Sequence, residues 1–368
     1  MFVKSLNVQN FRNYENISID LSPGINVFYG NNAQGKTNLL EAVYLLATAR
    51  SHRTTNEKEC IRQGKDEAIL KVVLDIRGKE EKIDIHLRKT GRKTIQINGY
   101  PITKISELIG RMHVVVFSPE DLSLIKNGPT QRRKFIDMEI SQVDPIYLYN
   151  LQQYYKVLRQ RNHLLKNVLH PSLVQDTIFA WDEQLSHYGV LIMKRRKTFV
   201  EQLEVTTAKI HESITKEKEK LTIFYDHAMP MEEGEYLSLL KKNLEKDMKY
   251  GTTGCGVQHD DMILYLNGAD VRIYGSQGQQ RTTALSLKLA EMRMMREEVK
   301  DDPILLLDDV MSELDKDRQI QLAEYIKNSQ TIITCTGIED SIKQLPSGKM
   351  FYVENGMLTE DLTMEETV

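Results

Sequence analysis

Eight residues of the chain have the types and spacing of a phosphate-binding loop. They match the pattern G-x-x-x-x-G-K-[ST] and read Gly30-Asn31-Asn32-Ala33-Gln34-Gly35-Lys36-Thr37. In such a loop the glycines let the backbone curl so that N–H groups face phosphate oxygens, and the lysine reaches the β- and γ-phosphates. The threonine hydroxyl is a ligand for Mg²⁺. The segment therefore predicts a site for a nucleotide phosphate chain and its metal.

A second feature is a pair of acids directly after an apolar run. Ile304 to Leu307 is continuously apolar, as parallel strands buried on both faces are, and Asp308 and Asp309 follow it. An acid at the end of such a strand beside a phosphate loop holds Mg²⁺ directly or through water. We assign Asp308 to the metal together with Thr37, and Asp309 is the candidate that polarises an attacking water. A turn cap is the alternative for an isolated acid.

A third feature is the segment Ser276-Gln277-Gly278-Gln279, which opens a predicted helix. A serine hydroxyl and a glycine N–H at a helix start form an anion site, although an ordinary N-cap is the alternative. The segment resembles the signature motif of ABC-type ATPases. In those heads the motif completes the nucleotide pocket of a second subunit, so the resemblance implies that Ser276, Gly278 and Gln279 act on a partner copy. Ser312 to Asp315 resembles the D-loop of the same superfamily.

The elements that must position these residues follow from hydrophobic periodicity. A buried strand at 25–29 precedes the phosphate loop, and an amphipathic helix through Leu39 to Ala47 follows it. Alternating apolar residues predict further strands, several joined as an antiparallel meander, at 3–8, 17–21, 69–76, 82–87, 94–97 and 114–117.

Later in the chain the period changes. The stretch 131–221 has helical periodicity interrupted by a loop around His170-Pro171, which predicts two or three long antiparallel helices. A hairpin with the turn Asn267-Gly268 is expected next. The predicted elements of this part are hairpin strands at 262–266 and 271–274, helices at 279–299 and 316–328, and strands at 304–307 and 331–335.

The interval between the motifs predicts the domain organisation. Asp308 lies 272 residues after Lys36 (308 − 36), whereas a compact domain has about 100–150 residues. A second lobe must therefore be inserted between them. We expect an α/β, ABC-type ATPase head (a P-loop NTPase) in which 1–115 and 300–368 form the nucleotide-binding lobe. The inserted, mainly helical lobe is then 116–299, and it carries the signature segment.

Composition limits the partners. The 368 residues include 49 Lys and Arg and 52 Asp and Glu, for a formal charge of −3, so an anionic partner must be held by local patches. Three isolated cysteines disfavour a disulfide framework or zinc site. Short apolar runs and the absence of a secretory pattern predict a cytoplasmic protein. The sequence has three basic clusters, which are Lys194-Arg195-Arg196-Lys197, Arg132-Arg133-Lys134, and Arg159 with Arg161. Each cluster is either a solvated helix face or a site that binds DNA phosphates without regard to sequence.

Taken in order, the motif blocks resemble the RecF family of SMC-like recombination mediators. The blocks are Phe11 to Tyr14, Gly30 to Thr37, Phe117 to Leu122, Gly128-Pro129, Arg132 to Lys134, Tyr274 to Gln279 and Leu307 to Asp315. The resemblance implies an ATP- and Mg²⁺-dependent homodimer that hydrolyses ATP slowly, binds duplex and gapped DNA, and helps to load the recombinase at gaps. It also implies RecR, and in second place RecO, as partners.

The resemblance also assigns residues. Lys36 and Thr37 of one subunit hold phosphate and metal, and Ser276 and Gly278 of the other close on the γ-phosphate. Arg12 lies beside the nucleotide, with a solvated arginine as the alternative. Asp309 stands where most ABC ATPases have glutamate, which predicts slow hydrolysis.

The strand at 331–335 also lacks the usual switch histidine, so that contact falls to the hydroxyl of Thr334 or Thr336. A transport ATPase subunit is disfavoured by the long insertion. A small-molecule kinase or GTPase is disfavoured because it leaves the signature segment unexplained.

Overall fold

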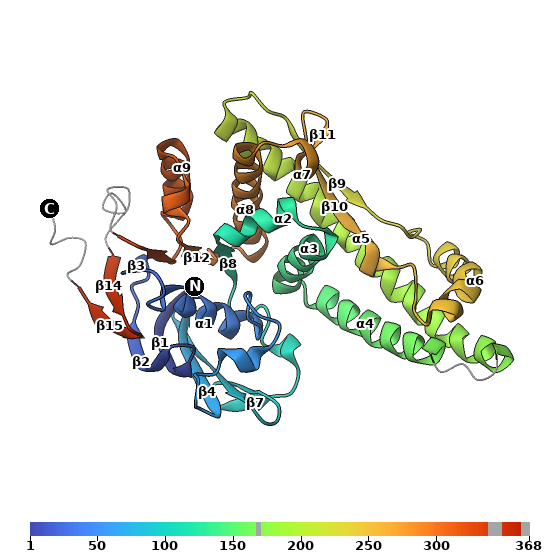
Figure 1. Ribbon diagram of the computed structural model, residues 1–368, viewed down its shortest axis with the longest axis horizontal. Helices are drawn as coiled ribbons and strands as arrows, with labels where there is room; N and C mark the ends of the chain where they lie inside the picture. Colours follow the sequence, from blue (N-terminus) through green and yellow to red (C-terminus); the bar gives the residue numbers. More distant parts are fainter. Residues whose placement is uncertain (167–170, 338–347, 362–368) are drawn as a thin grey trace. The chain divides into compact units, whose positions relative to one another are not determined.

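The structure, a computed structural model, describes residues 1–166, 171–337 and 348–361 and divides the chain into two compact units (Figure 1). The first unit contains the described residues of Met1–Asp121 and Glu291–Val368, and the second is Leu122–Ala290. One unit is thus built from both ends of the chain and the other from its middle. The second boundary falls inside α8 (Gln277–Val299), so both units share this helix.

The first unit has an antiparallel sheet in which apolar residues alternate, so that one face is buried. Leu70 pairs with Ile85 on the buried face, and Lys71 pairs with Asp84 on the other. The turn Asn98-Gly99 has the left-handed backbone that a tight hairpin needs. The strand order is β2 (Tyr14–Asp20), β1 (Phe2–Phe11), β4 (Glu67–Ile76), β5 (Lys79–Arg88), β6 (Thr94–Ile97) and β7 (Tyr100–Ile102). The predicted meander is confirmed, with β7 as an additional short strand.

The same unit has a second sheet. Its neighbouring strands are parallel except for the two that come last in the chain, which pair in antiparallel fashion. The apolar run 304–307 is explained by burial of its strand on both faces, and four of the five residues at 25–29 are buried in the same way. The order is β15 (Met357–Glu360), β14 (Gly348–Glu354), β3 (Ile25–Tyr29), β13 (Thr331–Cys335), β12 (Ile304–Asp308) and β8 (Val114–Phe117). β14 and β15, joined by the turn Asn355-Gly356, are not among the predicted strands.

Helix α1 (Lys36–Thr48) lies in the core that joins the two sheets. Leu40 and Leu46 of this helix belong to the same buried cluster as Leu70 of β4 and Leu306 of β12. Burying one such side chain stabilises the fold by about 1.5–3 kcal/mol, so the helix that follows the phosphate loop is firmly anchored. Besides the end of α8, this unit has α9 (Lys316–Ile326) and short 3-10 turns at Glu57–Cys60, Ile105–Glu107, Pro119–Asp121 and Met311–Glu313.

The second unit is mainly helical. Its helices are α2 (Leu122–Lys126), α3 (Pro129–Val143), α4 (Pro145–Lys166), α5 (Pro171–Thr215), α6 (Glu233–Tyr250), α7 (Val271–Tyr274) and most of α8. Figure 1 shows α4 packed along α5. A short antiparallel sheet in the order β11 (Ala269–Asp270), β10 (Asp261–Leu266), β9 (Leu221–Asp226) packs on α5 through β9. The unit also has a 3-10 turn at Val257–His259.

Two element predictions for this unit are wrong. The helical stretch does not continue to Leu221, because α5 ends at Thr215 and β9 begins at Leu221 to pair with β10. The segment 271–274 is helical instead of a strand, because the Asp270 side chain accepts a hydrogen bond from the Arg272 N–H and caps a helical turn. The structure adds α6, where no element is predicted. Residue 170 of the expected loop lies outside the described residues.

Within the described ranges, no helix combines the length and the apolar character that crossing a membrane requires.

Candidate nucleotide-binding site

The phosphate loop connects β3 to α1 in the first unit. Gly30 and Gly35 have φ angles of +147° and +118°, which side chains disfavour. A Cβ atom at Gly30 would lie 2.4 Å from the carbonyl oxygen of Val353, and one at Gly35 would lie 2.5 Å from Asn13 Nδ2. The loop is therefore a closely packed curl that requires both glycines, and its rim, 31–33, is exposed.

Neighbouring turns hold the carbonyl groups of this loop. The Gln34 carbonyl accepts hydrogen bonds from Asn13 Nδ2 at 2.7 Å and from the backbone N–H of Gly356 at 3.2 Å. The Gly35 carbonyl accepts one from the Tyr14 hydroxyl at 3.0 Å. Sequence reasoning assigned no role to these supporting residues. The Asn-Gly pair at 355–356, which follows an apolar run, is the hairpin signal that could have revealed the β14–β15 turn.

The start of α1 suits an anion. Among the described residues no side chain caps this end of the helix, and its first turn has no acidic residue. The N–H groups and the helix dipole at such an end favour negative charge.

Lys36 is folded back over the loop. Its ammonium donates to the carbonyls of Gly30 at 2.6 Å and Asn31 at 2.8 Å, and the side chain is buried. Burial lowers the pKa of Lys36, and the carboxylates of Asp309 and Asp308 oppose that shift. The Lys36 ammonium thus lies at the centre of the loop, and the carboxylates of Asp308 and Asp309 are close enough to affect its pKa.

Thr37 and Asp308 meet at the point where α1 begins and β12 ends. Thr37 Oγ1 donates to Asp308 Oδ1 at 2.8 Å, and Thr334 Oγ1 donates to the same oxygen at 2.7 Å. The contact follows from sheet register, since Asp308 pairs with Thr334 and Thr334 pairs with Phe28 of β3. Of the two hydroxyl groups proposed in place of a switch histidine, Thr334 is thus in direct contact with the acid.

The residues present fit Mg²⁺. A carboxylate and a hydroxyl are hard oxygen donors of the kind that this ion uses with phosphate oxygens and water. No group of three or more His, Cys, Asp or Glu side chains able to hold a metal occurs in the described part of the chain. Thr37 and Asp308 would therefore hold an ion only together with a nucleotide and water.

Asp309 has a left-handed backbone, with φ +53°, directly after the strand. Its N–H donates to the Thr334 carbonyl at 3.1 Å, and its own carbonyl accepts from the Ser312 hydroxyl at 2.8 Å. A non-glycine residue held in this region costs of order 1–3 kcal/mol, and such residues cluster at active sites.

Arg12 is occupied by a carboxylate of α1. Its Nε and Nη2 donate to the two oxygens of Glu41 at 2.8 and 2.6 Å, and its Nη1 donates to the Glu59 carbonyl at 3.0 Å. The hydrogen bond to Glu41 raises the pKa of Arg12. The structure therefore places Arg12 as a brace on α1, and its contact with a nucleotide stays a prediction.

The signature segment lies in the second unit. Ser276 and Gly278 are exposed at the start of α8. The Ser276 N–H donates to Gln279 Oε1 at 2.9 Å, and the Gln279 N–H donates to Ser276 Oγ at 3.3 Å, which is a capping box. The structure thus groups Lys36, Thr37, Asp308 and Asp309 in the first unit and Ser276 to Gln279 in the second. Their meeting across two copies stays a prediction.

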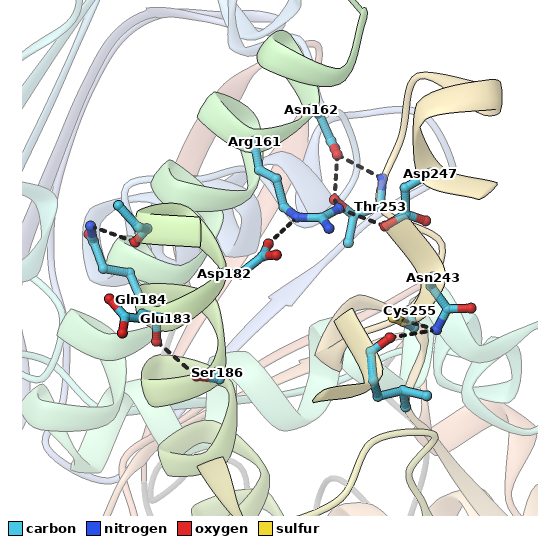
Figure 2. A network of polar contacts seen from close by, with 12 residues as sticks. Arg161, Asn162, Asp182, Glu183, Gln184, Ser186, Asn243, Asp247, Thr253 and Cys255 are labelled. Atoms are coloured by element: carbon cyan, nitrogen blue, oxygen red, sulfur yellow. Dashed lines mark hydrogen bonds and ion pairs between the residues drawn. The ribbon is translucent and has the colours of Figure 1, made fainter. Parts of the chain in front are cut away.

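Three arginines of the predicted DNA-binding clusters are buried. Arg161 donates to Asp182 at 2.6 Å and to Asp247 at 2.7 Å, and both contacts are drawn in Figure 2. Arg196 pairs with Asp137 and Asp260, and Arg132 with Asp261. All three side chains are at most 4% exposed. A role for these three in gripping DNA is wrong, because their guanidinium groups are buried and already paired with carboxylates. Arg159, Lys194 and Lys197 are exposed.

Together, the mostly parallel sheet, the loop after β3 and the acids at the end of β12 define an ATPase head of the ABC and SMC type. A family model described as the RecF/RecN/SMC N terminal domain matches residues 2–357. The Smc head domain from Pyrococcus furiosus has the same fold, with a TM-score of 0.58 at 17% identity over 99% of this chain and 97% of that one.

The chain belongs to the RecF family. It is 46% identical to the DNA replication and repair protein RecF of Lachnoclostridium phytofermentans, over 97% of this chain and 99% of the relative. It is also 46% identical to that of Agathobacter rectalis over the same shares. A solved structure of the recombination mediator protein RecF with ATP, from the RecFOR pathway, is 36% identical, covers 98% of both chains and has a TM-score of 0.92.

Proposed function

We propose that this protein is an ATP-dependent DNA-binding switch of recombinational repair and replication restart. In the presence of ATP and Mg²⁺ two copies associate, and slow hydrolysis releases them. The observation that carries the proposal is the contact of Thr37 with Asp308 beside the curled phosphate loop. The RecF structure solved with ATP supports the choice of nucleotide.

The nucleotide site works through its own side chains. The loop N–H groups and Lys36 bind the phosphate chain, and Thr37 and Asp308 hold the ion, which when bound neutralises phosphate charge. Asp309 orients the attacking water and accepts its proton. Hydrolysis is slow because the aspartate carboxylate is shorter than the usual glutamate and its backbone is fixed by Ser312 and Thr334.

Association of two copies follows from differential affinity. ATP drives dimerisation only if it binds the dimer more tightly than the monomer. The exposed Ser276 and Gly278 at the start of α8 provide this difference by binding the γ-phosphate on the other copy. Ile273 and Tyr274, just before them, are 60% and 73% exposed. An apolar pair beside a polar anion site suits burial against a second copy.

We assign the DNA contact to the first unit. In the second unit Arg132, Arg161 and Arg196 are buried in ion pairs. The exposed Lys194 and Lys197 there lie beside Glu232 and Glu201. Lys93 Nζ donates to the Ala49 carbonyl at the end of α1. Arg50, which follows Ala49, and Arg92, which precedes Lys93, are both exposed, and the exposed Arg53 lies in the same loop as Arg50. Arg53 Nη1 also donates at 2.9 Å to Asn38 in the first turn of α1. The exposed arginines Arg50, Arg53 and Arg92 grip the phosphate backbone of duplex or gapped DNA without reading sequence.

The pathway role rests on the relatives. The solved RecF structures belong to the RecFOR pathway. We assign RecR, and in second place RecO, as partners with which this protein helps to load the recombinase at single-stranded gaps.

Sedimentation velocity with and without ATP tests the switch. Wild type should form dimers only with ATP, Lys36→Arg should lose both nucleotide binding and dimers, and Ser276→Arg should keep ATP binding but stay monomeric. Normal dimerisation of Ser276→Arg with ATP would contradict the shared site. Lys218→Ala, an exposed change in the same unit, is the control.

A further inference from the structure

A chain of hydrogen bonds joins the end of α5 to the signature segment. Gln279 Nε2 donates to Glu219 Oε1 at 2.9 Å, and Glu219 Oε2 is 3.1 Å from His211 Nε2. The amide oxygen of the same glutamine accepts from the Ser276 N–H at 2.9 Å. The Gln279 amide is therefore held at both ends, by Glu219 and by the first residue of the signature segment.

His211 fixes the position of Glu219. The histidine is completely buried in α5, and its Nδ1 is 3.1 Å from Ser286 Oγ, two turns further along α8. Glu219 is 20% exposed, between this histidine and the half-buried Gln279. The contacts tie the end of α5 to α8 at two levels, so that the carboxylate has little freedom to move.

The backbone before Glu219 is strained in a way that fits this role. Lys216 and Glu217 have φ angles of +53° and +61°, two consecutive non-glycine residues in the left-handed region. The Glu217 N–H donates to the Glu212 carbonyl at 2.8 Å and closes the end of α5. Backbone strain at such residues persists only where surrounding contacts determine the conformation. Here the strained turn carries Glu219 back to α8.

A serine, a histidine and a glutamate in contact are also the residue types of a catalytic triad for hydrolysis, which is the alternative interpretation of this group. The geometry argues against it. Ser286 is completely buried, and its hydroxyl already donates to the Thr282 carbonyl at 2.8 Å within the helix. A nucleophile must reach its substrate, whereas this hydroxyl faces only protein. The group is therefore a support for α8.

We propose that Glu219 is the positioning residue of the signature segment. It orients the Gln279 amide so that its oxygen stays on the Ser276 N–H and the first turn of α8 is ordered before a phosphate arrives. An ordered site loses less conformational freedom on binding and so binds more tightly. The inference rests on the proposed function, since the phosphate concerned is the γ-phosphate of ATP on a second copy.

Variants that change or exchange the charges of Glu219 and Gln279 test the contact between these two side chains. Gln279→Glu keeps an oxygen for the Ser276 N–H but places two carboxylates against each other. It should weaken ATP-driven dimerisation about tenfold, which corresponds to about 1.4 kcal/mol. Glu219→Gln combined with Gln279→Glu restores an amide–carboxylate pair and should return dimerisation to within about threefold of wild type, less than about 0.7 kcal/mol. Glu219→Ala should match Gln279→Glu, and the exposed Glu212→Ala should have no effect.

The readouts are the dimer dissociation constant by sedimentation velocity in ATP and the monomer affinity for a fluorescent ATP analogue. All variants should bind the analogue as wild type does, because the first unit is untouched. Failure of the double variant to recover would overturn the positioning role, even if Glu219→Ala proves unstable. Wild-type dimerisation by Gln279→Glu while Ser276→Arg stays monomeric would also overturn it and leave the proposed function intact. Normal dimerisation by Ser276→Arg would instead contradict the proposed function.

Discussion

Thr37 Oγ1 lies 2.8 Å from Asp308 Oδ1, although 271 positions separate the two residues. The contact is produced by sheet order, because β13 lies between β3 and β12 and pairs in parallel with both. The loop that ends β3 and the acid that ends β12 therefore emerge at the same edge of one sheet. A whole second unit is inserted between them without disturbing the site, since the pairing depends only on the strands.

Replacing Asp308 should remove the effect of Mg²⁺ on nucleotide binding. Asp308→Asn keeps the size of the side chain and an oxygen for Thr37, but removes the charge that an ion needs. We expect wild type to bind ATP more tightly with Mg²⁺ than with EDTA, and the variant to bind equally in both. Isothermal titration calorimetry measures this, with Asp66→Asn, whose side chain is 98% exposed, as the control. A variant that keeps the full Mg²⁺ effect would exclude Asp308 as a ligand.

Asp309 should affect turnover and leave binding unchanged. As an acceptor for the proton of the attacking water, it is expected to contribute about 10²–10⁴-fold to the rate. Asp309→Asn keeps the side-chain shape and tolerates the left-handed backbone as well as aspartate does. We predict a fall in kcat of about 10²-fold or more with an unchanged Kd for ATP, measured by phosphate release under saturating DNA. A kcat within a few fold of wild type would assign the water to another residue.

The parts that sequence reasoning predicts correctly are those governed by local rules. The phosphate loop needs glycines at fixed spacing, and the strand before Asp308 needs an apolar run, so both can be identified without a partner. β14 pairs with β3, which lies more than 300 residues earlier in the chain, and no local pattern identifies that partner. Arg161 illustrates the same limit, because an arginine on a helix looks solvated until Asp182 and Asp247 are placed beside it.

The ion cluster in Figure 2 should be important for the stability of the second unit. Arg161, Asp182 and Asp247 are at most 1% exposed, so Arg161→Met leaves two buried carboxylates without their cation. Removing one partner of such a group costs about 3–5 kcal/mol. We predict a decrease of this size in the free energy of unfolding in urea. The exposed neighbour change Arg159→Met should stay within about 0.5 kcal/mol of wild type.

Replacing the whole cluster separates burial from pairing. Arg161→Met with both aspartates changed to leucine removes every charge of this cluster, and such replacements are often neutral or stabilising. The triple variant should therefore be more stable than Arg161→Met alone. If it is less stable, the cost lies in packing and the pairing argument is wrong.

Lowering the pH should reduce the stability of the first unit, because Glu41 becomes protonated. Burial raises the pKa of this carboxyl, but hydrogen bonds from Arg12 and Ser51 outweigh burial, so the pKa in the fold lies below the ordinary 4.5. A carboxyl with a lowered pKa contributes stability that is fully present above its unfolded value and is lost as the pH falls through its folded value. The urea midpoint should therefore decrease below about pH 4.5. The decrease should be smaller in Arg12→Met/Glu41→Gln, whereas Glu15→Gln, an exposed change, should behave as wild type. Equal pH dependence in all three would exclude this pair as the source.

The exposed arginines Arg50, Arg53 and Arg92 should determine how DNA binding depends on salt. Removing one contact with a DNA phosphate reduces the slope of log affinity against log salt by about 0.9. Changing all three arginines to alanine should flatten the slope by about 2–3 and weaken binding equally for unrelated sequences, as measured by fluorescence anisotropy with gapped duplexes in ATP. Arg159→Ala/Lys197→Ala removes two exposed cations of the second unit and is the matched control. If the control flattens the slope and the triple variant does not, the grip belongs to the second unit, and the assignment to the end of α1 must be abandoned.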